Sequence, residues 1–121
     1  MKKILVINND IDTMSLLKNW LEKKSYTVKY TGNEEEVPAI MEDFSPHLVI
    51  ADVMQHELVE RLKKNKKTRS IPVLLMTGYT LRQTINRLPG DDIIEKPFNL
   101  ALFEKKIERL IQKVVTINAA N

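Results

Sequence analysis

Pro46-His47-Leu48-Val49-Ile50-Ala51-Asp52 is a mostly apolar run that leads straight into one carboxylate. A run this short, bounded by a proline and an acid, favours a strand buried on both faces over a helix. Asp52 would then lie at the carboxyl end of that strand, where ligands gather in open parallel sheets. Asp52 is therefore the first residue to consider for a function.

Outward from this run, short apolar segments alternate with amphipathic ones, the pattern of parallel strands joined by helices. The other expected strands are Ile4–Ile7, Tyr26–Tyr30, Ile71–Met76 and Asp91–Glu95. The expected helices have these apolar positions: Met14, Leu17, Trp20 and Leu21; Val37, Ile40, Met41 and Phe44; Leu58, Val59 and Leu62; Leu81, Ile85 and Leu88; Leu102, Phe103, Ile107, Leu110, Ile111 and Val114. Asp12 or Thr13 is expected to cap the first helix, and Asn99 the last.

Composition indicates one globular domain over residues 1–121, with residues 116–121 expected to form a tail. Of its 121 residues 43% are hydrophobic, and none is cysteine, which excludes disulfides and thiolate metal sites. The two histidines, His47 and His56, are too few for a typical zinc site. The net charge of +3 is too even for a dedicated nucleic-acid binder unless the positive charge is concentrated on one face.

No segment has the length of a targeting or membrane element. The apolar run Ile4–Ile7 is too short for a signal peptide core. No stretch approaches the roughly 20 apolar residues that cross a bilayer. We therefore expect a soluble cytoplasmic protein.

Polar residues that follow separate strands are expected at one edge of the sheet. These are Asn8-Asn9-Asp10, Asp52, Thr77 and Lys96. A carboxylate nucleophile, with a cation and a hydroxyl to hold phosphoryl oxygens, suits formation of an acyl phosphate. Each residue alone has a plainer explanation, because Asp52 could be a cap, Thr77 part of a turn and Lys96 a solvated cation.

The chain as a whole resembles the receiver domain of two-component response regulators, from Lys2 to about Val115. Lys3–Ile7 is similar to the first strand of the family, and Pro46–Asp52 to the strand that presents the phosphoacceptor. Ile71–Gly78 and Asp91–Phe98 are similar to the strands that carry the family's hydroxyl and lysine. The resemblance implies an α/β, flavodoxin-like three-layer fold, with a five-stranded parallel sheet in the order 2-1-3-4-5 and five helices.

By this resemblance Asp52 is the phosphoacceptor, Thr77 the hydroxyl that follows the phosphoryl group, and Lys96 its cation. The implied function is that of a stand-alone receiver in a two-component phosphorelay, a signalling domain rather than an enzyme. A histidine kinase or phosphotransfer protein is implied upstream and a protein partner downstream. Neither a membrane nor a nucleic acid is expected as a partner, and a homodimer stays open.

The sequence departs from the family pattern around the expected metal site. The family's acidic pair falls on Asn8 and Asn9, and its Met-Pro and Gly loop after the phosphoacceptor is missing. The implied Mg²⁺ ligands are Asn9, Asp52 and the backbone carbonyl of Met54. Because Mg²⁺ gives up water reluctantly and prefers carboxylates, we expect its binding to be weak or absent. Whether Asp10 or Asp12 replaces the missing carboxylates stays open.

Three other functions are also compatible with the sequence. The departures at Asn8, Asn9 and Ile93, the last at the family's switch aromatic, favour a pseudo-receiver that binds a protein partner without phosphorylation. A flavin or nucleotide domain would need a glycine-rich phosphate loop, which is missing after the first strand. Nucleic-acid binding through Lys63–Arg69 competes with a solvated helix end whose cations suit the helix dipole.

Overall fold

The computed structural model describes residues 2–78, 89–96 and 99–120, with side chains as far as residue 112. Its strands are β1 (Lys3–Ile7), β2 (Thr27–Thr31), β3 (Leu48–Asp52), β4 (Val73–Thr77) and β5 (Asp92–Glu95). They form one parallel sheet in the order β2-β1-β3-β4-β5. The predicted fold class and strand order are confirmed.

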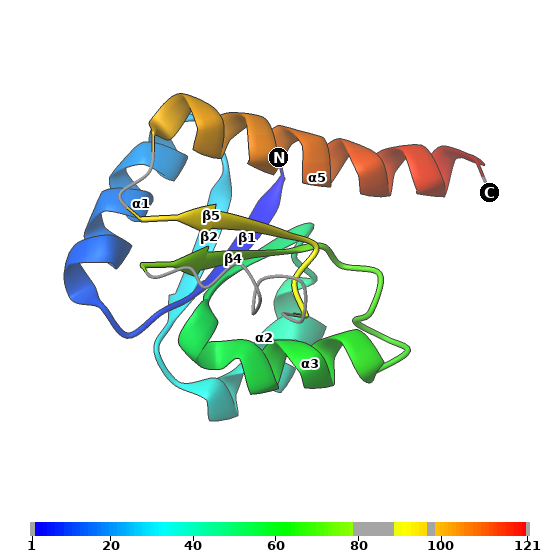
Figure 1. Cartoon of the computed structure of the whole chain (residues 1–121). Coiled ribbons are helices and arrows are strands. Elements are labelled where there is room, and N and C mark those ends of the chain that lie inside the picture. The colour runs from blue at the N-terminus through cyan, green and yellow to red at the C-terminus, as the bar shows by residue number, and fades with distance from the viewer. Residues whose placement is uncertain (1, 79–88, 97–98, 121) are drawn as a thin grey trace.

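Helices cover both faces of this sheet (Figure 1). Those described are α1 (Ile11–Lys23), α2 (Val37–Phe44), α3 (His56–Lys64) and α5 (Leu100–Ala120), with 3₁₀ turns at Glu34–Glu36 and Val53–Gln55. The predicted helix containing Leu81, Ile85 and Leu88 lies outside the described residues.

Two apolar layers hold the helices on the sheet, because alternate strand residues point to opposite faces. Strand residues such as Ile4, Val6 and Ile50 pack with α1 and α5 in one layer. Their neighbours Leu5 and Val49 pack with α2 and α3 in the other. Burial on both faces explains why the central strands are continuous apolar runs.

Several predicted helix details are wrong. The cap of α1 is Asp10, two residues before the first predicted cap, because its extended backbone lets its carboxylate accept from the Asp12 N–H at 3.1 Å. Leu102 was expected on the buried side of α5 but is 48% exposed, whereas Phe103 is fully buried. Helix α5 also continues to Ala120 and so includes residues 116–120 of the expected tail.

The predicted cap of α5 is present. The Asn99 side-chain oxygen accepts from the backbone N–H of Ala101 at 2.7 Å and that of Leu102 at 3.3 Å. Over the part of the chain described here, no helix is both long and apolar enough to traverse a lipid bilayer.

His47, just before β3, is held between backbone groups of the neighbouring strand. Its Nδ1 accepts from the Lys3 N–H at 2.9 Å, which requires the neutral ring. Burial, with the charges of Lys2 and Lys3, lowers the pKa of His47 below its ordinary 6.5. The unfolded chain therefore binds the proton more readily than the folded one.

We expect this depressed pKa to make stability depend on pH. The contribution of neutral His47 to the free energy of unfolding is complete above about pH 6.5 and is lost as the pH falls below that value. The free energy of unfolding, from urea titrations at several pH values, should therefore decrease on acidification in this range. H47Q should flatten the dependence, and H56Q, at an exposed histidine, should leave it unchanged. Equal slopes in wild type and H47Q would contradict the assignment.

Candidate functional site

Three polar side chains meet at the carboxyl edge of the sheet because each continues the alternation of its strand. Each lies two residues beyond a residue of the α1/α5 layer, so all three belong to that face: Asn8 after Val6, Asp52 after Ile50, and Lys96 after Ile94. Strands β1 and β3 are neighbours, with Ile7 opposite Ala51, so Asn8 and Asp52 end adjacent strands.

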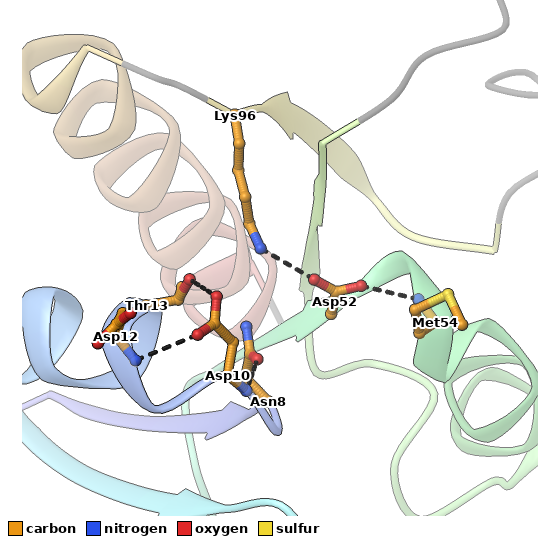
Figure 2. Close-up of polar contacts among 7 residues, drawn as sticks. All are labelled: Asn8, Asp10, Asp12, Thr13, Asp52, Met54 and Lys96. Carbon is orange, nitrogen blue, oxygen red and sulfur yellow. Dashed lines mark hydrogen bonds and ion pairs between the residues drawn. The ribbon is translucent and has the colours of Figure 1, made fainter.

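Asp52 and Lys96 form an ion pair at the centre of this edge (Figure 2). The Lys96 Nζ lies 3.0 Å from Asp52 Oδ2, and the side chains are 26% and 18% exposed. The other carboxylate oxygen, Oδ1, accepts from the Met54 backbone N–H at 3.0 Å. Both oxygens of Asp52 are therefore engaged, although solvent still reaches the pair.

Thr77 ends β4 and is 2% exposed. It follows Met76, which lies opposite Asp52 in the sheet register. The backbone carbonyl oxygen of Thr77 accepts from the backbone N–H of Lys96 at 2.7 Å, so the end of β4 holds the backbone of Lys96 in place. The structure thus puts the three predicted site residues at one edge of the sheet.

Asp10 places a second carboxylate at the same edge, where it caps the N-terminus of α1. Besides the Asp12 N–H, it accepts from the Thr13 hydroxyl at 2.6 Å. This hydroxyl lowers the pKa of Asp10, with help from the Asp12 and Thr13 backbone and the Lys96 charge, against a smaller effect of burial. Asp10 is therefore an ionised cap, and Asp12 is an exposed residue of the first turn.

The two asparagines after β1 are placed differently from each other. Asn8 is 2% exposed, and its Oδ1 accepts from the Asp10 N–H at 2.7 Å. Its Nδ2 is buried without a hydrogen-bond partner in the described parts of the chain. Asn9 is exposed and lies against Gly32, where an added Cβ would be 2.6 Å from Asn9 Oδ1. Gly32 follows β2, on the opposite side of β1 from Asp52.

These placements do not fit a tight Mg²⁺ site. Of the expected ligands, the amide oxygen of Asn9 lies at the β2 side, and both Asp52 oxygens already have donors. Asn8 offers the site N–H groups, which repel a cation. Among the described residues there is also no cluster of three His, Cys, Asp or Glu side chains that could hold a metal.

The basic run Lys63–Arg69 has a structural role at its first residue. The Lys63 Nζ pairs with Asp91 and donates to the Ile71 carbonyl at 2.8 Å, which ties the end of α3 to the entrance of β4. A hollow of about 610 Å³ lies nearby between α2 and α3, lined by residues such as Met41 and Leu58. None of the three predicted site residues lines it.

The orientation of Asn8 is the feature of the site that the sequence did not reveal. An asparagine after a strand can present either its oxygen or its nitrogen to the sheet edge. The Asp10 N–H decides between them, and this contact depends on the turn into α1. The one signal in the sequence was the acid two residues after Asn8, which caps α1 and so sets that turn.

Two curated proteins are similar to this chain over most of its length. The transcriptional regulatory protein CpxR of Klebsiella pneumoniae is 30% identical over 118 residues, which cover 93% of this chain and 50% of that protein. The nisin biosynthesis regulatory protein NisR of Lactococcus lactis is 31% identical over 117 residues, or 92% of this chain and 51% of that protein. The chain thus spans about half the length of these relatives.

A solved structure is also similar to this chain over most of its length. The signal receiver domain of a signal transduction histidine kinase from Syntrophus aciditrophicus superposes with a TM-score of 0.85 at 26% identity, covering 94% of this chain and 92% of that one. The family model of the response regulator receiver domain matches residues 4–108. The chain therefore belongs to the family of response regulator receiver domains.

Proposed function

We propose that this chain is the receiver of a two-component phosphorelay in which Asp52 accepts a phosphoryl group. The observation that supports this most strongly is the Asp52–Lys96 pair, a carboxylate beside an ammonium at a solvent-reached sheet edge. Receiver domains interact with histidine kinases or phosphotransfer proteins, and such a protein is the proposed donor here. In this proposal the chain passes a signal and does not turn over a separate substrate.

The proposed reaction is a single displacement at phosphorus. A carboxylate oxygen of Asp52 attacks the phosphorus of the donor, the bond from phosphorus to the donor's leaving group breaks, and that group departs with the electron pair. The new bond is a mixed anhydride between Asp52 and phosphate. Negative charge moves from the carboxylate to the phosphoryl oxygens, within reach of the flexible Lys96 side chain, whose ammonium can follow it.

A second candidate is a pseudo-receiver that binds a protein partner and never carries phosphate. The Asp52–Lys96 pair also supports this candidate, because both Asp52 oxygens already have donors in the unmodified chain. In that case Lys96 would serve as a permanent counterion that holds β3 and β5 in one arrangement. The two candidates differ in whether Asp52 ever reacts.

Intact-mass analysis after incubation with acetyl phosphate separates the two candidates. We expect the wild type to gain the mass of one phosphoryl group and Asp52→Asn to gain none. The control is Asp43→Asn, which removes an exposed carboxylate of α2 and should still be labelled. An unlabelled wild type, folded by circular dichroism, would favour the pseudo-receiver, and a labelled Asp52→Asn would refute Asp52 as the acceptor.

A further inference from the structure

Asn8 carries a buried hydrogen-bond donor that no described residue of the unmodified chain uses. Its orientation is determined by the Asp10 backbone N–H, which can donate only to the amide oxygen. The amide nitrogen therefore points away from Asp10 and has no hydrogen-bond partner among the described residues. Asn8 is only 2% exposed, so this nitrogen is also shielded from water. A buried unpaired donor is unfavourable until an acceptor reaches it.

The nitrogen faces the place where a phosphoryl group on Asp52 would lie. Figure 2 shows it turned toward the space between the Asp10 carboxylate and the Asp52–Lys96 pair. Asn8 and Asp52 also end adjacent strands and belong to the same face of the sheet. A group bound to Asp52 therefore has the Asn8 amide on one side and the Lys96 ammonium on another.

The polarity of these groups suits an anion. The amide presents hydrogens, and the ammonium presents a positive charge, so both attract oxygen and both repel a metal cation. A phosphoryl oxygen could accept from each of them. The carboxylates that would attract a cation are Asp52, which the reaction itself converts, and Asp10, which caps α1.

We propose that Asn8 Nδ2 donates a hydrogen bond to a phosphoryl oxygen on Asp52, and that the site accepts a phosphoryl group without Mg²⁺. This inference rests on the proposed function of Asp52. As a neutral donor, Asn8 supplies part of the charge stabilisation that Mg²⁺ would supply in a receiver site that binds it. With acetyl phosphate, an Asp52 oxygen bonds to phosphorus while acetate leaves with the electron pair, so no proton transfer is needed.

The test measures the labelling rate with acetyl phosphate by intact mass, in EDTA and in excess Mg²⁺. We expect the wild type to be labelled at rates within about twofold in the two buffers. Asn8→Ala removes the donor and should slow labelling in EDTA by about tenfold or more. Asn8→Asp replaces the donor by a negative charge, so it should be slowed further in EDTA and recover in Mg²⁺.

The matched control is Asn19→Asp, which makes the same chemical change at an exposed position of α1. It should keep the wild-type rate in both buffers. Thermal unfolding by circular dichroism checks that every variant is folded. A second readout is the ¹⁵N–¹H resonance of the Asn8 side-chain amide, which should shift downfield on labelling as its hydrogen bond forms.

The outcomes separate this inference from the function on which it rests. A wild type labelled only in Mg²⁺, or an Asn8→Ala variant labelled at the wild-type rate in EDTA, would overturn the role of Asn8 and leave Asp52 as the acceptor. A wild type labelled in neither buffer would overturn the proposed function and this inference together. Labelling in EDTA that depends on Asn8 is the result that supports both.

Discussion

Replacing Phe103 with alanine is expected to lower the free energy of unfolding by about 3–5 kcal/mol. The Phe103 ring is fully buried in the α1/α5 layer, with its centroid 5.3 Å from that of Trp20 on α1. Removing it leaves a cavity between α1, α5 and the sheet that the surrounding strands can fill only in part. A domain of this size has about 5–15 kcal/mol of stability in total, so the loss would be a large fraction.

The matched control is Leu102→Ala, at the preceding position of the same helix. Leu102 is 48% exposed, so its truncation should change stability by no more than about 0.5 kcal/mol. Urea titrations of both variants, followed by circular dichroism, measure the difference. Similar losses for the two variants would contradict the rotation of α5 on the sheet that buries Phe103 and exposes Leu102.

Replacing Lys96 with methionine is expected to slow phosphoryl transfer to Asp52 by about a hundredfold, the effect of removing one group that stabilises developing charge. Methionine keeps much of the length of the side chain and removes only the ammonium that lies 3.0 Å from Asp52. As negative charge moves onto the transferred oxygens, the wild type can follow it with Lys96. The variant has no cation at that position.

Lys106→Met is the control for the general consequences of losing an ion pair. Lys106, on α5, is 19% exposed and pairs with Asp92 at 2.9 Å, much as Lys96 pairs with Asp52. Both variants lose a partly buried ion pair, and because Asp92 keeps Arg109 as a second partner, Lys106→Met should lose no more stability than Lys96→Met. Only Lys96→Met should lose labelling in the intact-mass assay, and wild-type labelling of that variant would rule out the ammonium as a catalytic group.

The strands and the site edge were predictable because burial on both faces leaves a strong pattern. Leu48 to Ala51 are all fully buried, so the strand is a continuous apolar run that stops at the residue on the sheet edge. The same holds for β4, which ends at Thr77. Once the strands alternate with helices, the parallel arrangement brings their ends together, and with them Asp52 and Lys96.

Helix ends and side-chain directions were less predictable because they depend on single contacts. Three neighbouring residues are of types that can cap a helix: Asp10, Asp12 and Thr13. The observed cap is Asp10 because the helical backbone begins directly after it, at Ile11. Leu102 and Phe103 are both apolar, and only the rotation of α5 on the sheet decides which is buried. The direction of the Asn8 amide likewise depends on one backbone N–H.

Chemical trapping tests most directly whether Asp52 carries the phosphoryl group. Borohydride reduces an aspartyl phosphate to the alcohol, which marks the modified residue for peptide mass spectrometry. After incubation with acetyl phosphate, we predict that position 52 alone is reduced, in proportion to the phosphoryl gain in the intact mass. Reduction at Asp10 or Asp12, or a phosphoryl gain with Asp52 unreduced, would contradict the assignment.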